Sequence, residues 1–513
     1  MSNKVVAVIE IGSAGLKMRI AQKQKNEITE LDYLDYPLSL GHDTYTDKKI
    51  SMEVIREMTQ VLEGFCRLME EYGVSRYRAV ASTALREAQN RSYVLDQIKI
   101  HNDIDVEILE DIENKSLIFS EILMAFSQES MPKLSNAMLA YVGEGSVGVA
   151  RYENSEICMT QNIKIGSMKL SDMFMEITLE TDRYEDILDE YLDKLSHTMK
   201  KHLHGKKIQN LVIVGNEIET ISKMLDISPK NGYFRLSKGK LSELYKRLRK
   251  LSDSAICEKY GITDEQCDRT LTSLALYISL FVMVEANEII SPILGFWDSI
   301  FQSLLSPKKE QGKTAFMGEH SYACARDIAE KFECDKAHYM KVLSFSEKIF
   351  VKLKKLHGLS MRELHYLNLA CVLEESGKYI NVKNYEYSTY QIIRHSSFIG
   401  LSKHEKLIIA LITRYRMLKS AAEMDEKASA LSEQDRLLVA KLNAMFRLAE
   451  ALDVSHKQRI GDIQTGLNED RFQITVFSED DLLLESWAFR EAASFFEDVF
   501  GIKAELVRRS ALI

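Results

Sequence analysis

The sequence predicts an α/β protein of two related lobes, followed by an all-helical domain and a small α+β segment. Strand and helix patterns alternate over the first 300 residues, and a glycine-tipped β-hairpin occurs twice there. From about residue 310 the apolar residues follow the helical period. A chain of 513 residues, 45% hydrophobic and 28% charged, can bury several cores.

The first lobe opens with a β-branched apolar run that turns at Gly-Ser-Ala-Gly into an alternating segment, which is typical of a hairpin. A later strand is expected to run directly into a helix that continues through Arg91. The expected elements are a hairpin over 5–12 and 16–21, a helix over 51–72, a strand over 77–81 and a helix from 82 to 91.

The second lobe repeats the hairpin over 137–152, around the turn Gly-Glu-Gly-Ser, and has a further strand at 211–214. Amphipathic helices are then expected at 320–332, 338–356, 361–374, 389–395, 403–419 and 433–452. The chain ends with a strand at 471–477, a helix at 486–500 and a strand at 503–507, which form the small α+β cap.

Bulk properties restrict the partners and the compartment. A net charge of −9 argues against a surface built for nucleic acid. The seven cysteines show no metal-ligand or disulfide spacing, and the sequence shows no signal peptide and no long apolar run. We therefore expect a cytoplasmic protein with reduced thiols, no specific nucleic acid and no membrane association.

The two hairpin turns are candidate phosphate-binding loops. Backbone N–H groups of a glycine turn can surround phosphate oxygens because small residues allow close approach. Gly12 and Ser13 lie in the first turn, and Gly143, Gly145 and Ser146 lie in the second. Each turn alone is better explained as an ordinary connection between strands.

A third candidate lies where the strand at 77–81 meets the following helix. Thr83 would place a hydroxyl at the helix N-terminus, and Arg86 would follow one turn later, where the helix dipole favours an anion. The alternative is an ordinary hydroxyl N-cap with an exposed arginine.

These segments, in this order, resemble the exopolyphosphatase and guanosine pentaphosphatase (Ppx/GppA) family. EIGSAGLK at 10–17 resembles the family's first phosphate loop, DIGSNSxR, and ASTALREAQN at 81–90 resembles its ATSAxR(D/E)AxN motif. IGSMKL at 165–170 is similar to LGAVRL, and RLAEALD at 447–453 is similar to RLADALD. The resemblance covers about residues 5 to 505.

The resemblance implies two ribonuclease-H-like lobes of the actin and sugar kinase superfamily, then an HD-like helical domain and the cap. The implied domains are 1–125, 126–308, 309–425 and 426–513. A cleft between the lobes would hold polyphosphate or a guanosine polyphosphate, with Mg²⁺, in a homodimer. Lys17 and Asn90 join the phosphate-binding candidates, Glu10 becomes the metal candidate and Arg86 a catalytic one.

The carboxylates of this family are only partly kept. LEDIENK at 109–115 aligns with SGxEEAR, which puts Glu113 at the position of the general base. YVGEGSVG at 141–148 aligns with DIGGGSTE, so Tyr141 and Gly148 replace two carboxylates of the metal side, and Glu144 adds a charge to the loop. Glu10 replaces an aspartate, and GNE at 215–217 replaces GGT. These changes should weaken phosphate binding and hydrolysis.

The HD-like domain shows a similar loss. His338 fits the first histidine of an HD site, but Glu374 and Glu375 replace the His-Asp pair. We expect no metal site there, and His338 to be a packed or surface histidine.

Two classes of function remain open from the sequence. The protein is either a binding protein on a phosphatase scaffold with reduced or lost hydrolysis, or an active Mg²⁺-dependent exopolyphosphatase or guanosine pentaphosphate phosphohydrolase that uses Glu113 as base.

Overall fold

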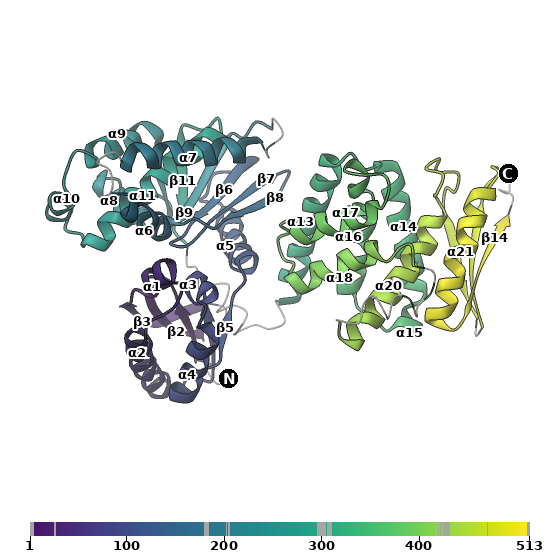
Figure 1. The fold of residues 1–513 in the computed structure, drawn as a ribbon, viewed down its shortest axis with the longest axis horizontal. Helices are drawn as coiled ribbons and strands as arrows, with labels where there is room; N and C mark the ends of the chain where they lie inside the picture. Colours follow the sequence, from purple (N-terminus) through teal and green to yellow (C-terminus); the bar gives the residue numbers. More distant parts are fainter. Residues whose placement is uncertain are drawn as a thin grey trace. The chain divides into compact units, whose positions relative to one another are not determined.

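The structure is a computed structural model that describes residues 5–24, 27–178, 184–201, 203, 206–294, 304, 310–418, 420, 423, 431–468 and 470–509. The chain forms two compact units, 1–317 and 318–513 (Figure 1). The first contains two α/β lobes, and the second is mainly helical. The mixed α/β class and the helical C-terminal region are thus as the sequence predicts. The finer division into four domains stays a prediction.

The first lobe is built on a five-stranded sheet in the order β3-β2-β1-β4-β5. Its strands are β1 (Val5–Ile11), β2 (Gly15–Gln24), β3 (Glu27–Pro37), β4 (Arg76–Ala81) and β5 (Val106–Ile108). Its helices are α1 (Leu40–Asp47), α2 (Met52–Glu71), α3 (Thr83–Glu87), α4 (Arg91–Asn102) and α5 (Asp111–Phe126). The central strand β1, apolar apart from Glu10, is almost wholly buried because hydrophobic clusters cover both of its faces, one with Ala7, Ile9 and Ile11 and the other with Val6 and Val8.

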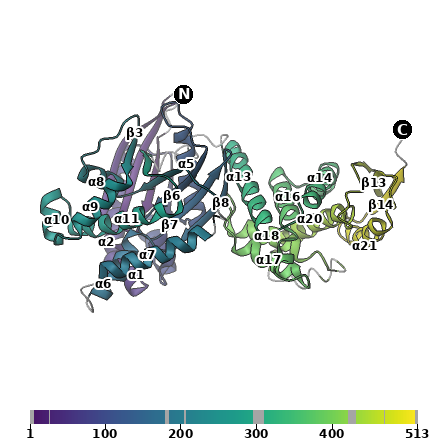
Figure 2. The ribbon, with the colours of Figure 1, turned by 90° about the horizontal axis from the view of Figure 1, so that it is seen from above.

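The second lobe has a six-stranded sheet in the order β10-β11-β9-β6-β7-β8. Its strands are β6 (Asn136–Val142), β7 (Val147–Glu153), β8 (Glu156–Ile163), β9 (Asn210–Gly215), β10 (Tyr233–Ser237) and β11 (Glu288–Pro292). Its helices are α6 (Ser167–Thr178), α7 (Tyr184–Lys201), α8 (Ile218–Met224), α9 (Lys238–Leu248), α10 (Asp253–Tyr260) and α11 (Asp264–Leu280), followed by the 3-10 turn η1 (Phe281–Met283). Figure 2 shows α11, which packs on β6 and α7, beside this sheet.

The two sheets repeat one topology. In each, an antiparallel meander (β1-β2-β3, β6-β7-β8) is extended by two parallel strands (β4-β5, β9-β11) on the other side of its first strand. The relation between the lobes, inferred from the repeated hairpin, therefore extends to their strand order.

The helix expected from 82 to 91 is wrong, since the chain forms two helices there. Ala88 is extended, and α4 begins only at Arg91. The side chain of Asn90 bonds the backbone N–H and C=O of Ile50, at 3.0 and 2.8 Å. These contacts with a segment 40 residues away compete with helical hydrogen bonds and break the helix.

Unit 2 contains the helices expected from the apolar period and a three-stranded sheet. Its helices are α13 (Glu310–Lys331, which begins before the unit boundary), α14 (Lys336–Lys352), α15 (Lys354–His357), α16 (Met361–Leu373), η3 (Ser376–Tyr379), α17 (Tyr385–His395), α18 (Lys403–Arg414), α20 (Glu433–Ala451) and α21 (Leu483–Phe500). Its strands are β12 (Ile463–Leu467), β13 (Arg471–Phe477) and β14 (Lys503–Arg509). The helix expected over 338–356 is divided at Leu353 into α14 and α15.

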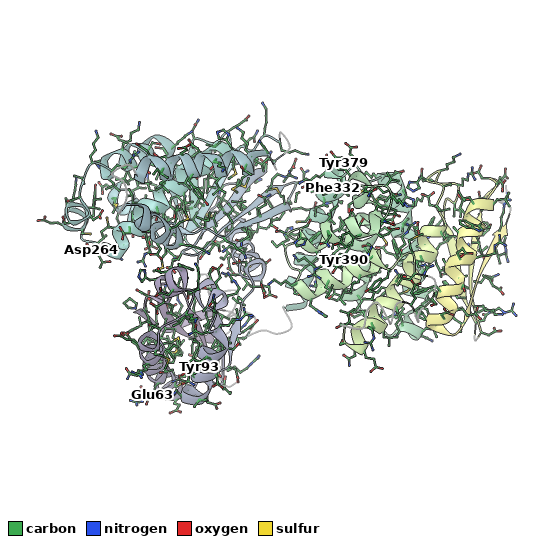
Figure 3. The ribbon with its side chains drawn as sticks, viewed as in Figure 1. Glu63, Tyr93, Asp264, Phe332, Tyr379 and Tyr390 are labelled. Atoms are coloured by element: carbon green, nitrogen blue, oxygen red, sulfur yellow. The ribbon has the colours of Figure 1, made fainter. Side chains whose placement is uncertain are left out.

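Local sequence signals fix several helix starts. Ser360 with Glu363 and Ser402 with Glu405 form capping boxes at α16 and α18. Aromatic side chains then hold neighbouring elements together, as in the edge-to-face contact of Phe332 with Tyr379, whose ring centroids are 5.8 Å apart (Figure 3).

All seven cysteines are free thiols. Within the described residues, no helix combines the length and apolar character that crossing a bilayer requires.

Candidate phosphate site

A cavity of about 240 Å³ lies between the two lobes of unit 1. Its walls come from the two hairpin turns, the start of α3, one face of α5, the end of β9 and the segment after β11. These walls meet because the repeated topology brings β1 and β6, with the turns that follow them, to corresponding edges of the two sheets. The site predicted from sequence and this cavity therefore coincide in their glycine turns.

The two turns are closed by the same kind of backbone hydrogen bond. The N–H of Gly12 donates to the carbonyl of Gly15 at 2.9 Å, and the N–H of Gly143 donates to the carbonyl of Ser146 at 3.1 Å. Gly145 has no room for a side chain, since a Cβ there would lie 2.3 Å from Tyr45 Oη and 2.6 Å from Thr83 Cγ2. The close approach of backbone to neighbouring groups thus requires glycine at this position.

Of the eleven candidate residues from sequence, eight line the cavity: Glu10, Gly12, Ser13, Lys17, Thr83, Gly143, Gly145 and Ser146. The buried hydroxyl of Ser13 shares a 2.7 Å hydrogen bond with Tyr45, a residue that the sequence did not single out. The proposed roles of these side chains stay predictions.

Three candidates, Arg86, Asn90 and Glu113, are not among the residues that line the cavity. The guanidinium of Arg86 donates to the carbonyl of Leu109 at 2.8 Å, to Thr83 Oγ1 at 3.1 Å and to Asp111 at 2.5 Å. Glu113 closes a capping box at the start of α5, where it accepts the N–H of Glu110 at 3.2 Å. Arg86 and Glu113 thus stabilise the segments that carry Thr83 of α3 and Asn114 and Lys115 of α5 into the cavity wall.

Glu10 and Lys17 are cross-strand partners on β1 and β2 at the floor of the site. Burial raises the pKa of Glu10 to about 7, a change that Lys17 opposes and that Glu144 increases. Burial by itself would lower the pKa of Lys17, but the carboxylates of Glu10, Asp35 and Glu144 outweigh it and raise this pKa. Glu10 is therefore an acid that changes charge near neutral pH.

The carboxylate of Glu144 links three loops of the site. The N–H of Ala14 in the first turn donates to its Oε2 at 3.0 Å, and the side-chain amide of Asn216 donates to its Oε1 at 3.1 Å. A backbone N–H expected to face phosphate is thus occupied by an anion that the protein supplies itself. The sequence indicates the added charge of Glu144 but not its contact with a residue 130 positions away.

Lys115 is the main residue that the sequence reasoning missed. Its side chain is 5% exposed and lines the cavity. Its ammonium donates to Ser146 Oγ at 2.8 Å and lies 4.6 Å from the ring centroid of Tyr141, a cation–π distance. A Cβ at Gly148 would lie 2.8 to 3.0 Å from three carbons of this lysine, so the glycine makes room for it.

Four glutamates line this cavity, but its donor set fits a divalent cation poorly. Mg²⁺ is bound through one or two carboxylates together with substrate phosphates. Here Glu144 is bonded to Ala14 and Asn216, burial holds the pKa of Tyr141 far above its ordinary value so that it is a neutral phenol, and Lys17 and Lys115 bring positive charge. Within the described residues, no three His, Cys, Asp or Glu ligand atoms converge in this cavity.

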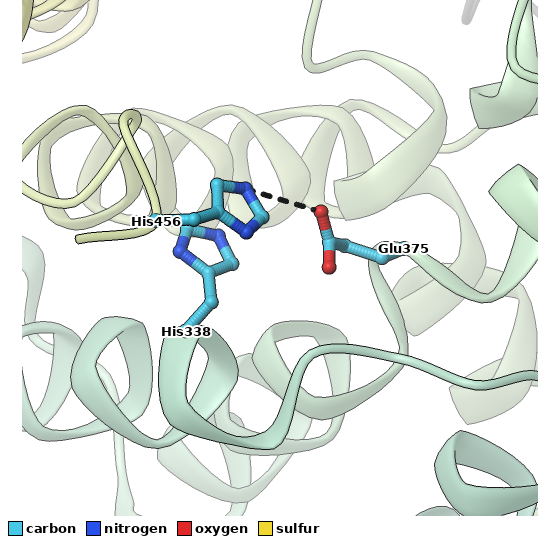
Figure 4. Close-up of side chains that lie close together, drawn as sticks. All are labelled: His338, Glu375 and His456. Carbon is cyan, nitrogen blue, oxygen red and sulfur yellow. Dashed lines mark ion pairs between the residues drawn. The ribbon is translucent and has the colours of Figure 1, made fainter. Parts of the chain in front are cut away.

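Unit 2 contains a separate cluster of titratable residues around His338 (Figure 4). His338, Glu375 and His456 bring potential ligand atoms within 4.8 Å of one another, although the sequence leads us to expect no metal site there. His338 is buried rather than at the surface, and its Nδ1 lies 2.9 Å from Asp453. Sequence reasoning did not pair His338 with His456, because the two are 118 positions apart.

The ring geometry favours an ion-pair network over a metal centre. The two imidazoles stack in parallel, with centroids 3.8 Å apart and planes at 10°. A nitrogen binds metal in the plane of its own ring, and two parallel planes do not converge on one ion. Glu375, in addition, is already paired with Lys378 and with His456. The cluster is best described as buried carboxylates neutralised by imidazolium and other cations.

The fold and the cavity together define a class, a two-lobed α/β protein whose paired glycine turns line one polar cavity. Residues 19–305 match the model of the Ppx/GppA phosphatase family, and residues 322–489 match that of Ppx/GppA phosphatase, domain III. The chain belongs to the Ppx/GppA phosphatase family.

One solved structure supports this assignment at the level of the fold, and a second is similar in part. An exopolyphosphatase from Cytophaga hutchinsonii is 19% identical with a TM-score of 0.53, over 59% of this chain and 98% of its own. A Ppx/GppA family member from Aquifex aeolicus is 19% identical with a TM-score of 0.49, over 60% of this chain and 99% of its own. At 19% identity, the likeness to the Cytophaga hutchinsonii structure establishes a shared fold and leaves the chemistry of the site to its own residues.

Proposed function

We propose that this protein binds the phosphate chain of polyphosphate or of a guanosine polyphosphate in the cavity of unit 1, with reduced or no hydrolysis. Family membership supports the class of ligand. The observation that carries the proposal is the pair of glycine turns, one of which already donates a backbone N–H to the carboxylate of Glu144. A turn that accepts a carboxylate has the polarity to accept a phosphate oxygen.

The changes at the metal side support weak turnover. A neutral phenol at 141 and glycine at 148 cannot hold a cation or orient water as carboxylates do. Asn114 and Lys115, rather than Glu113, are the residues at the start of α5 that line the cavity. An active Mg²⁺-dependent hydrolase with Glu113 as base is the alternative.

The test is to measure binding of long-chain polyphosphate and of guanosine pentaphosphate by calorimetry, and phosphate release with Mg²⁺ or Mn²⁺, for the wild type and Glu113→Gln. Glutamine also serves in a capping box, so this variant should keep the start of α5 intact. We expect equal binding in both proteins and equal, background-level release. Release that Glu113→Gln abolishes would establish the hydrolase instead, and no binding of either ligand would refute the proposal.

We also expect binding to depend on pH through Glu10. Because its pKa is raised to about 7, Glu10 is mostly neutral below pH 7 and charged above it. The charged form repels a phosphate in the same cavity, so affinity should fall as the pH rises from 6 to 8. Glu10→Gln should reduce this fall, as measured by the dissociation constant of tripolyphosphate at each pH. An unchanged pH profile in this variant would show that other groups control it.

Family membership supports three further proposals: a homodimer, a cytoplasmic location, and an origin of the helical part of unit 2 in an HD-type domain. The contact of His338 with Asp453 is compatible with the last of these. Sedimentation of the purified full chain would test the first.

A further inference from the structure

We propose that the ammonium of Lys115, seated in the space left by Gly148, is the fixed cation of the phosphate site and takes the place of a divalent metal ion. This inference rests on the proposed function and names the residue that supplies the positive charge for binding phosphate. Anion binding at this site would then need no metal.

The surroundings of Lys115 leave its charge without a counter-ion. Among the described residues it forms no ion pair, and its hydrogen bond goes to the neutral hydroxyl of Ser146. Asp111 is the carboxylate that acts on it electrostatically, but Asp111 is itself paired with Arg86 at 2.5 Å. A charge that is 5% exposed is costly unless an opposite charge or a well-placed acceptor meets it.

Burial lowers the pKa of Lys115 to about 8, with Asp111 acting against this change and Arg86 in the same direction. Part of the Lys115 population is therefore neutral near pH 8, and a bound anion would raise the pKa and keep the ammonium protonated. Tyr141, whose ring faces the ammonium, stays a neutral phenol and offers only its π face. A bound anion would supply the counter-charge that Lys115 lacks. The ammonium of Lys115 lies at the second glycine turn, so the anion would bind there.

The location of the ammonium fits a phosphate on that turn. Lys115 bonds Ser146, the residue that closes the Gly143 turn, so an oxygen accepted by this turn would be within reach of the ammonium. The space is specific to a glycine at 148, because a Cβ there would meet the aliphatic part of Lys115 at under 3.1 Å. The position of the Lys115 side chain thus depends on Gly148, although Lys115 lies on α5 and Gly148 on β7 of the other lobe.

The experiment measures the dissociation constant of inorganic tripolyphosphate for the full chain in EDTA and in Mg²⁺. We expect the wild type to bind in EDTA, with Mg²⁺ weakening rather than strengthening binding, because Mg²⁺ neutralises the ligand. Lys115→Met should weaken binding in EDTA by about tenfold to a hundredfold, the usual effect of one charge-assisted hydrogen bond. Gly148→Ala should weaken it in the same direction by displacing the lysine.

The exposed Lys133, outside the cavity walls, provides the matched control, and Lys133→Met should change binding by less than about twofold. Circular dichroism and the melting temperature of each variant separate lost folding from lost binding. Wild-type binding that needs Mg²⁺, or equal affinity in Lys115→Met, would overturn this inference while the proposed function stands. No wild-type binding under either condition would overturn the proposed function itself.

Discussion

Replacing Glu144 by glutamine or alanine is expected to strengthen the binding of tripolyphosphate by about tenfold or more. The carboxylate of Glu144 occupies the N–H of Ala14 and adds negative charge beside Glu10. A phosphate must displace this group or accept its repulsion, which at the effective dielectric of a protein surface costs on the order of 1 to 4 kcal/mol. Removing the charge should make the binding free energy more favourable by about 1.4 kcal/mol, which corresponds to the tenfold gain in affinity.

The two substitutions separate charge from occupancy. Glutamine keeps an oxygen for the N–H of Ala14 and removes only the charge, whereas alanine also frees that N–H and the amide of Asn216. If the charge of Glu144 is the main obstacle, the two variants should bind tripolyphosphate equally. If its hydrogen bond to the N–H of Ala14 also matters, the alanine variant should bind more tightly. The measurement is calorimetric titration in EDTA at pH 7.

Glu219 supplies the control for this result. It lines the same cavity but is exposed to solvent, so its charge is screened. Glu219→Gln should alter affinity by less than about twofold. An affinity in both Glu144 variants that is equal to or below that of the wild type would show that Glu144 supports the site by joining its loops rather than by competing with the ligand.

What could be predicted from sequence depended on how locally each feature is encoded. The hairpins of β1-β2 and β6-β7 were predicted because apolar alternation and glycine lie within a few residues of each other. Strand β3 was not predicted, because it is largely exposed and so carries little of the apolar alternation that marks a half-buried strand.

The same rule governs the site. Its glycines and Thr83 were predicted because they belong to short motifs. The contact of Glu144 with Ala14, and the fit of Lys115 against Gly148, join residues that are far apart in the sequence and on different lobes. Such contacts depend on how the lobes fold together, and no local pattern carries that information.

Replacing His338 by glutamine is expected to lower the free energy of unfolding by about 3 to 5 kcal/mol at pH 6, the usual effect of removing one partner from a buried ion pair. Nδ1 of His338 lies 2.9 Å from Asp453, and its Nε2 lies 3.4 Å from Glu374. Both carboxylates are buried, so the neutral amide would leave their charges poorly compensated.

This loss should depend on pH in a definite direction. Burial alone would lower the pKa of His338, but the hydrogen bond to Asp453 and the charges of the nearby Glu374 and Glu375 outweigh it and raise this pKa to about 10. An unfolded histidine titrates near 6.5, so between pH 6.5 and 10 the folded chain holds one proton more. The stabilisation is complete below pH 6.5 and is lost as the pH rises towards 10.

Urea unfolding of the full chain, followed by circular dichroism from pH 6 to pH 10, measures this difference between wild type and His338→Gln. His404 gives the control, because it pairs with Asp435 at 3.1 Å but its side chain is 60% exposed, and a surface pair contributes about 0 to 1 kcal/mol. A difference that stays constant with pH would show that His338 acts through packing alone. Stabilisation of the wild type by added Zn²⁺, absent in the variant, would instead mean that the stacked imidazoles reorient to bind metal, and the ion-pair description of this cluster would be wrong.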